Sequence, residues 1–218
     1  MATIPKMKVL FVHGLGRSPL SGWPLLRQLN TAGFEVGSFG YLTSVESFSV
    51  IAKRLAERIS NIASQGEYVL IGHSLGGVLI RVAVNSLPAK VRRPTQVFLL
   101  GSPCRASRLA QRFGGNPVFR WLSGDCGVLL GSEQWMSRLG SIDSPTTGIA
   151  GVKGVTWRRG PFGGEPNDGI VTLSEVSAEW LVDQVKLPVV HTLLPASKQV
   201  AGIIIERLRQ AHAHSEDA

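Results

Sequence analysis

Residues 68–77, Tyr-Val-Leu-Ile-Gly-His-Ser-Leu-Gly-Gly, decide the fold of this chain. Residues 68–71 form an apolar run typical of a fully buried strand, and residues 75–86 have the composition of a buried helix that Pro88 ends. The turn between them, Gly72-His73-Ser74-Leu75-Gly76, matches the pattern G-x-S-x-G. We therefore expect a sharp strand-turn-helix with Ser74 at its apex.

That context gives the serine a specific property. Such a turn, the nucleophile elbow, holds its serine in a strained backbone conformation and lifts the hydroxyl above the sheet. Gly72, Gly76 and Gly77 lack the side chains that would collide at so tight a crossing. Ser74 is therefore our candidate nucleophile.

Outward from this turn, apolar strands alternate with helices. The strands are apolar throughout instead of alternating with polar residues, which predicts an α/β fold whose parallel sheet has helices on both faces. Strands are expected at 8–12, 34–41, 68–71, 96–100, 148–157 and 187–190, and helices at 22–30, 44–64 (capped by Ser44 or Ser47), 75–86 and 196–212.

Residues 104–148 break this alternation. They are rich in Gly, Ser and Arg yet contain several aromatic residues. A long irregular segment in a compact domain is usually functional. We expect it to be a cap or lid inserted into a single domain of residues 1–218.

Composition narrows the class of protein. The chain has 218 residues, 44% of them apolar and 17% charged, which argues for one packed domain and against disorder. No apolar run reaches the roughly 20 residues needed to span a bilayer, and we expect no secretory signal. Cys104 and Cys126 are too few for a disulfide scaffold. We expect two free thiols in the cytoplasm, with one bridge between them as the alternative.

The chain is basic, with 23 Lys and Arg against 15 Asp and Glu, a net charge of 23 − 15 = +8. No block of five or more basic residues occurs, so solvated faces are the simplest explanation and nucleic-acid binding is not expected. Seven arginines nevertheless fall in or just after the 104–148 segment: Arg105, Arg108, Arg112, Arg120, Arg138, Arg158 and Arg159. If the charge has a partner, we expect an anionic membrane surface at the mouth of the site.

A serine hydroxyl needs an adjacent base, and the base needs a group that orients it. Of the five histidines, His191 follows a predicted strand end, at the sheet edge where open α/β folds collect their sites. We choose it as the base; the alternative is a histidine that is simply satisfied in the core or at the surface. Asp168, in a loop rich in Gly and Pro, is our choice of acid, and the competing candidates are Glu165, Asp143 and Glu175.

The sequence resembles the lipase and esterase branch of the α/β-hydrolase superfamily, especially its small single-domain lipases. The resemblance rests on residues 13–16 (HGLG), 72–77 (GHSLGG) and 167–171 (NDGIV), and on His191. The order Ser, Asp, His matches the order in this superfamily. The resemblance implies that the backbone N–H groups of Leu15 and Leu75 form the oxyanion hole, and that His13 positions the loop unless it is a plain turn histidine.

The substrate leaves a weaker signal. Trp23, Phe113, Phe119 and Trp121 are expected to line an acyl-binding pocket or to form an apolar lid, with core packing as the alternative for each. No metal-binding or cofactor motif is present, so none is expected. The hypothesis is a cofactor-free esterase acting on a small-molecule or lipid ester. A thioesterase, acyltransferase or amidase with the same triad and a non-catalytic lipid-binding module are the alternatives; the oligomeric state stays open.

Overall fold

A six-stranded parallel sheet organises the protein, with the strand order β2-β1-β3-β4-β5-β6. The computed structural model describes residues 7–155 and 157–216. The strands are β1 Lys8–Val12, β2 Glu35–Phe39, β3 Tyr68–His73, β4 Gln96–Leu100, β5 Thr146–Gly151 and β6 Asp183–Leu187. The predicted α/β class with a parallel sheet is confirmed.

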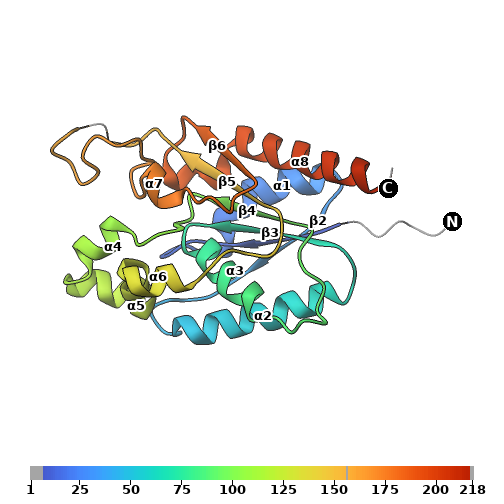
Figure 1. The fold of residues 1–218 in the computed structure, drawn as a ribbon, viewed down its shortest axis with the longest axis horizontal. Coiled ribbons are helices and arrows are strands. Elements are labelled where there is room, and N and C mark those ends of the chain that lie inside the picture. The colour runs from blue at the N-terminus through green and yellow to red at the C-terminus, as the bar shows by residue number, and fades with distance from the viewer. Residues whose placement is uncertain (1–6, 156, 217–218) are drawn as a thin grey trace.

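Helices cover both faces of the sheet (Figure 1). The helices α1 Trp23–Thr31 and α8 Lys198–Glu216 pack on one face, and α2 Phe48–Ala63 and α3 Leu75–Asn85 pack on the other. Two 3-10 helices, η1 Pro19–Gly22 and η2 His191–Ala196, precede α1 and α8. Ser47, not Ser44, caps α2, since its hydroxyl accepts a hydrogen bond from the amide of Val50. The apolar strands are thus buried on both sides.

The expectation of an irregular segment at residues 104–148 is wrong. The segment contains α4 Arg108–Phe113, α5 Pro117–Gly131 and α6 Glu133–Arg138, and β5 begins before the segment ends. Polar side chains start each helix: Ser107, Asn116 and Ser132 accept hydrogen bonds from first-turn amides. We call these three helices the helical cap; they lie at the carboxyl end of the sheet (Figure 1).

Two predicted strands were also misplaced. The strand expected at 148–157 ends at Gly151, because the following chain turns away and Gly154 donates its amide to the carbonyl of Asn167. The strand expected at 187–190 overlaps the observed strand β6 only at Leu187. Leu187 pairs with Gly151, the last residue of β5, so β6 has no partner strand beyond this point. The short helix α7 Leu173–Val176, which has a capping box between Thr172 and Glu175, was not predicted.

Candidate active site

Ser74 occupies the sharp turn between β3 and α3. Its backbone angles are φ 53° and ψ −123°, and among the described residues no other non-glycine residue has a positive φ. Such a conformation costs on the order of 1–3 kcal/mol and persists only where the surrounding structure enforces it. The turn therefore stores strain at the residue that the sequence marks as the nucleophile.

The glycines around Ser74 make this turn possible. A Cβ on Gly72 would lie 2.4 Å from the Cα of Gly77, and one on Gly76 would lie 2.1 Å from the carbonyl oxygen of Val12. Real Cβ atoms do not approach other atoms so closely. Any side chain at these positions would push the helix away from the sheet and displace Ser74.

Two contacts from the end of β4 fix the backbone of Ser74. Its amide donates to the carbonyl of Leu100 at 2.9 Å, and its carbonyl accepts from the hydroxyl of Ser102 at 2.6 Å. Ser102 is buried, and sequence reasoning missed it. The available signal was its position directly after a predicted strand, at the edge of the sheet where Ser74 also lies.

His191 and Asp168 form a buried pair. The Nδ1 of His191 donates to Oδ2 of Asp168 at 2.7 Å, and the amide of His191 donates to the carbonyl of Asp168 at 2.9 Å. This assignment leaves Nε2 of His191 with a free lone pair, as a general base requires. The two residues that the sequence singled out as base and acid are therefore in contact.

The loop around Asp168 holds its carboxylate in one orientation. Oδ1 accepts from the amides of Ile170 at 3.0 Å and Val171 at 2.9 Å, so only Oδ2 is directed at the imidazole. Asn167 supports the loop, because its side chain bonds both the amide and the carbonyl of Val155. The competitors Glu165 and Glu175 have other partners, among them Arg108, and Asp143 is exposed on the approach to β5.

Gly101 is a further residue that the sequence did not reveal. It follows β4 with φ 53°, and a Cβ there would lie 3.0 Å from both Oδ2 of Asp168 and Nδ1 of His191. The hydrogen-bonded pair therefore lies directly against the backbone of Gly101. A side chain would have to displace one of the two partners.

Ser74 and His191 line the same cavity. In the described part of the chain, no hydrogen bond joins the Ser74 hydroxyl to the imidazole. Catalytic hydrogen bonds are often long in an enzyme without substrate and tighten when substrate binds. The structure thus brings the predicted base to the cavity of the predicted nucleophile and pairs it with the predicted acid.

His73 orients His191 from the other side. Its Nε2 donates to the carbonyl of His191 at 3.1 Å, the two ring centroids are 4.8 Å apart, and its Nδ1 is buried without a hydrogen-bond partner. Burial, together with the nearby His191, holds the pKa of His73 well below its usual value. His73 is therefore neutral, and its proton is committed to the backbone of His191.

The loop after β1 lies against the nucleophile. A Cβ on Gly14 would lie 3.0 Å from the Cβ of Ser74. His13 stacks on Tyr41 at 4.1 Å, and the Tyr41 hydroxyl donates to the carbonyl of His13 at 2.6 Å. Burial lowers the pKa of His13, so a neutral, stacked imidazole braces the loop that precedes Leu15.

The two residues of the expected oxyanion hole both border this region. Leu15 lines the cavity, directly after the glycine that touches Ser74. Leu75 is buried and is the first residue of α3, where backbone N–H groups have no partner within the helix. Leu15 thus lines the cavity itself, whereas Leu75 does not line it but directly follows Ser74, which does.

The cavity above Ser74 has a volume of about 280 Å³ and mostly apolar walls. Of the aromatic residues expected to line it, Phe113 and Phe119 do so, with ring centroids 6.3 Å apart. Arg17 is the one Lys, Arg, Asp or Glu among the described residues that line it. The cavity can accept an apolar group and has a single positive charge on its wall.

The expectation for Trp23 and Trp121 is corrected, since neither lines the cavity. Trp23 is 56% exposed on α1, with the guanidinium of Arg27 over its ring at 5.5 Å. Trp121 is 71% exposed on α5. The helical cap turns Phe119 inward, and on the same helix Trp121 lies two residues further and falls on another face. Trp135 packs edge-on against Phe48 at 4.9 Å, away from the cavity.

Cys104 and Cys126 are both free and buried. Burial raises the pKa of the Cys104 thiol to about 11 and that of Cys126 to about 12, so both are protonated near neutral pH. Within residues 7–155 and 157–216, no group of three or more His, Cys, Asp or Glu side chains could hold a metal ion. None of the helices in these ranges is long and apolar enough to cross a bilayer.

Comparison with known proteins identifies the fold. No protein-family model matches the sequence, and no curated protein matches it. Among solved structures, a metagenomic carboxyl esterase superposes with a TM-score of 0.74 at 14% identity, over 97% of this chain and 77% of that chain. A lipase of Bacillus licheniformis in its propeptide form has a TM-score of 0.68 at 18% identity, over 92% of this chain and 50% of that chain.

This chain therefore spans half the length of the Bacillus lipase. A thioesterase of the prodiginine pathway in Streptomyces coelicolor has a TM-score of 0.59 at 15% identity, with 97% of this chain and 96% of that chain covered. The protein has the α/β-hydrolase fold.

Proposed function

We propose that the protein is a serine hydrolase that cleaves carboxylic esters through an acyl-enzyme on Ser74. The observation that carries this proposal is the buried Asp168–His191 pair, 2.7 Å between Oδ2 and Nδ1, at the cavity that a strained Ser74 also lines. A structural histidine would need neither a buried carboxylate on Nδ1 nor a free Nε2 at a cavity wall. The fold it shares with solved esterases and lipases supports the same class.

The chemistry follows from the roles of these side chains. Ser74 Oγ attacks the ester carbonyl carbon while Nε2 of His191 takes its proton, and Asp168 stabilises the imidazolium that forms. The amides of Leu15 and Leu75 bind the developing oxyanion. His191 then returns the proton to the leaving alkoxide, which departs as the alcohol. Water attacks the acyl-enzyme with His191 again as the base, and this step releases the carboxylic acid and restores Ser74.

The cavity supports an apolar acyl group. Leu109, Phe113, Phe119 and Leu130 from the helical cap contribute to its walls. Apolar walls with few polar groups suit an acyl chain better than a sugar or peptide. The helical cap is thus our candidate for the segment that sets acyl-chain preference.

The test compares Ser74→Ala with Ser141→Ala, a matched control whose serine is exposed on the approach to β5. Both are assayed for hydrolysis of a short-chain nitrophenyl ester and for covalent labelling by a fluorophosphonate probe. We expect Ser74→Ala to lose turnover and labelling while it unfolds at an unchanged temperature, and the control to behave as the wild type. Turnover or labelling that persists in Ser74→Ala would refute Ser74 as the nucleophile. A folded wild type that does not label would favour a non-catalytic lipid-binding module.

A thioesterase is the second candidate. The Streptomyces coelicolor thioesterase matches this chain over nearly the full length of both proteins. The same triad cleaves either bond, because the acyl-enzyme is identical and only the leaving group differs. A series of matched oxyesters and thioesters of equal acyl length distinguishes the two: a kcat/KM consistently higher for thioesters would assign the thioesterase.

A further inference from the structure

The first half of α5 presents an apolar face to solvent. Val118 is 64% exposed and Trp121 71%, and Leu122 is also exposed. Positions i, i+3 and i+4 lie on one side of a helix, so these three side chains form one stripe. Single exposed apolar residues are ordinary, whereas a contiguous group of them marks an interaction site.

A kink limits this stripe and holds it in place. Gly124 has φ 55° and ψ −143°, and a Cβ there would lie 2.2 Å from the carbonyl of Thr43. Beyond the kink, Asp125 accepts from the amide of Phe48 at 2.9 Å and so caps the start of α2. Thr43 in turn donates its hydroxyl to the carbonyl of Leu122 at 2.8 Å. The apolar stripe is therefore fixed to the core at its base.

Along the chain before the kink, the charged side chains near the stripe are all basic, and the nearest acidic residue in sequence is Asp125 beyond the kink. Between Glu67 and Asp125 the sequence contains no Asp or Glu. Arg120 lies on α5 between Val118 and Trp121, and Arg112 lies on the preceding helix α4. Both are exposed, and within the described ranges neither makes an ion pair. Positive charge next to exposed apolar groups suits a partner that is both anionic and apolar.

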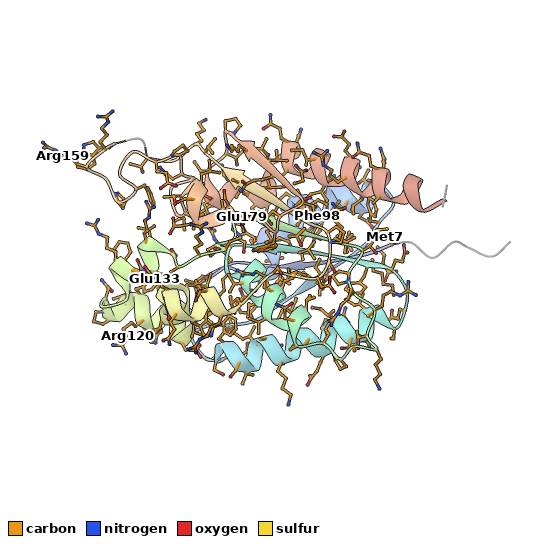
Figure 2. The ribbon with its side chains drawn as sticks, in the orientation of Figure 1. Met7, Phe98, Arg120, Glu133, Arg159 and Glu179 are labelled. Carbon is orange, nitrogen blue, oxygen red and sulfur yellow. The ribbon has the colours of Figure 1, made fainter. Side chains whose placement is uncertain are left out.

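A second segment of the same kind extends from the same end of the molecule. In the loop after β5, Trp157 is 66% exposed and precedes Arg158 and Arg159, both exposed and, in the part of the chain described, without ion pairs. Figure 2 shows Arg120 and Arg159 at one end of the molecule, on α5 and on this loop. An ion pair of 3.0 Å between Arg108 and Glu165 ties the loop to the start of α4. We call residues 112–122 together with 157–161 the docking end.

We propose that the docking end binds the surface of an anionic lipid bilayer. Tryptophan prefers the boundary between headgroups and acyl chains, apolar side chains enter the outer acyl region, and each arginine near an anionic surface adds roughly a five-fold gain in partitioning. Nucleic acid would pair with the arginines but would leave Val118 and Leu122 exposed to water. The bilayer satisfies both sets of side chains.

The cavity opens beside the first of the two segments, because Phe113 and Phe119 belong to residues 112–122 and line it. Phe113 of α4 and Ile170 of the Asp168 loop are exposed and also line the cavity. A docked protein would therefore take a lipid ester from the bilayer toward Ser74 without carrying its acyl chain through water. This consequence rests on the proposed function, whereas the docking itself does not.

The test is co-sedimentation of the full chain with phosphatidylcholine vesicles that contain or lack phosphatidylserine. We expect binding to the anionic vesicles that weakens with rising salt. Arg112→Gln/Arg120→Gln and Arg158→Gln/Arg159→Gln should each lower the partition coefficient by about 25-fold, which is two arginines at roughly five-fold each. Trp121→Ala should lower the binding that remains at high salt, because that part is apolar.

The matched control is Lys90→Gln/Arg92→Gln, which removes the same charge. Both residues are exposed in the connection that enters β4 at its amino end, the sheet edge opposite to the site. Distant charges are screened within about 10 Å at 0.1 M salt, so we expect less than a three-fold loss.

Equal losses in the control and test pairs would overturn the proposal, since net charge alone would then explain binding. Failure of the wild type to bind anionic vesicles would also overturn the proposal. So would a wild type that binds DNA but no vesicles, if the substitutions at the docking end abolish this DNA binding and the control substitutions do not. Activity on a soluble ester, measured in parallel, reports on the proposed function separately, because none of these arginines lines the cavity.

Discussion

Asp168→Asn tests whether the buried pair is catalytic. The replacement keeps the size of the side chain but converts one oxygen into an NH₂ donor. Oδ1 of Asp168 accepts from the amides of Ile170 and Val171, so the asparagine oxygen must stay there and its NH₂ must face His191. A donor opposite Nδ1 forces the imidazole into the other tautomer, with its proton on Nε2 and no lone pair directed at the cavity.

The expected magnitude follows from this geometry. Loss of the correct imidazole tautomer in a Ser-His-Asp triad lowers kcat by roughly 10⁴-fold, about 5 kcal/mol in the activation barrier. If the amide rotated instead, its NH₂ would meet two backbone donors and leave both unsatisfied, at about 1–3 kcal/mol each in stability. The two orientations therefore differ in their effect on unfolding.

The assay is steady-state hydrolysis of a short-chain nitrophenyl ester, with the unfolding temperature measured on the same sample. We expect kcat to fall by roughly 10⁴-fold and the unfolding temperature to change little. A kcat within ten-fold of the wild type would refute the reasoning, because His191 would then not depend on Asp168 for its tautomer. Retained activity would direct the search to Glu165, which lies in the same loop.

Two more predictions concern the surroundings of the pair. Gly101→Ala should lower kcat at least ten-fold, since its methyl group would lie 3.0 Å from Asp168 Oδ2 and His191 Nδ1. The control Gly140→Ala has a similar φ of 66° and open space around it, so it should cost only backbone strain of about 1–2 kcal/mol. Equal kcat in both variants would contradict this prediction. Stability should fall below pH 6.5, because the lowered pKa of buried His73 means that the unfolded chain binds the proton first. The free energy of unfolding should change by up to about 1.4 kcal/mol per pH unit because of this histidine. The measurement is thermal unfolding between pH 5 and 7.5. An unfolding temperature that does not change with pH in the wild type, or that changes equally in His73→Gln, would rule the histidine out as the cause.

The sequence predicted well wherever a local rule determines the structure. Glycines at 72, 76 and 77 around a serine after an apolar run allow few backbone conformations, so the turn at Ser74 followed from residues close in sequence. β1 Lys8–Val12 and β4 Gln96–Leu100 have the predicted bounds, because uninterrupted apolar runs end at glycine or polar residues. The predicted bounds were wrong for β5 and β6, because the neighbouring strand determines where each of these strands ends.

The helical cap also could not be predicted from the local sequence. Its helices α4 and α6 have six residues each, and α5 is interrupted at Gly124, so no long apolar period reveals them. Isolated helices of this length are marginal and form because tertiary packing stabilises them. Leu130 and Met136 are buried against the core, and that burial depends on residues far away in the sequence.

The sequence by itself determined the alternation of strands and helices from β1 to β4, the strained turn at Ser74, and the choice of His191 and Asp168 as its partners. Only the tertiary structure decided that Asp168 and His191 meet at 2.7 Å, that Gly101 and Ser102 brace the site, and that Phe119 faces the cavity while Trp121 faces solvent. The physical reason is the range of the interactions. Backbone sterics act between neighbours and are encoded locally, whereas these contacts join segments that meet only when the parallel strands align their carboxyl ends.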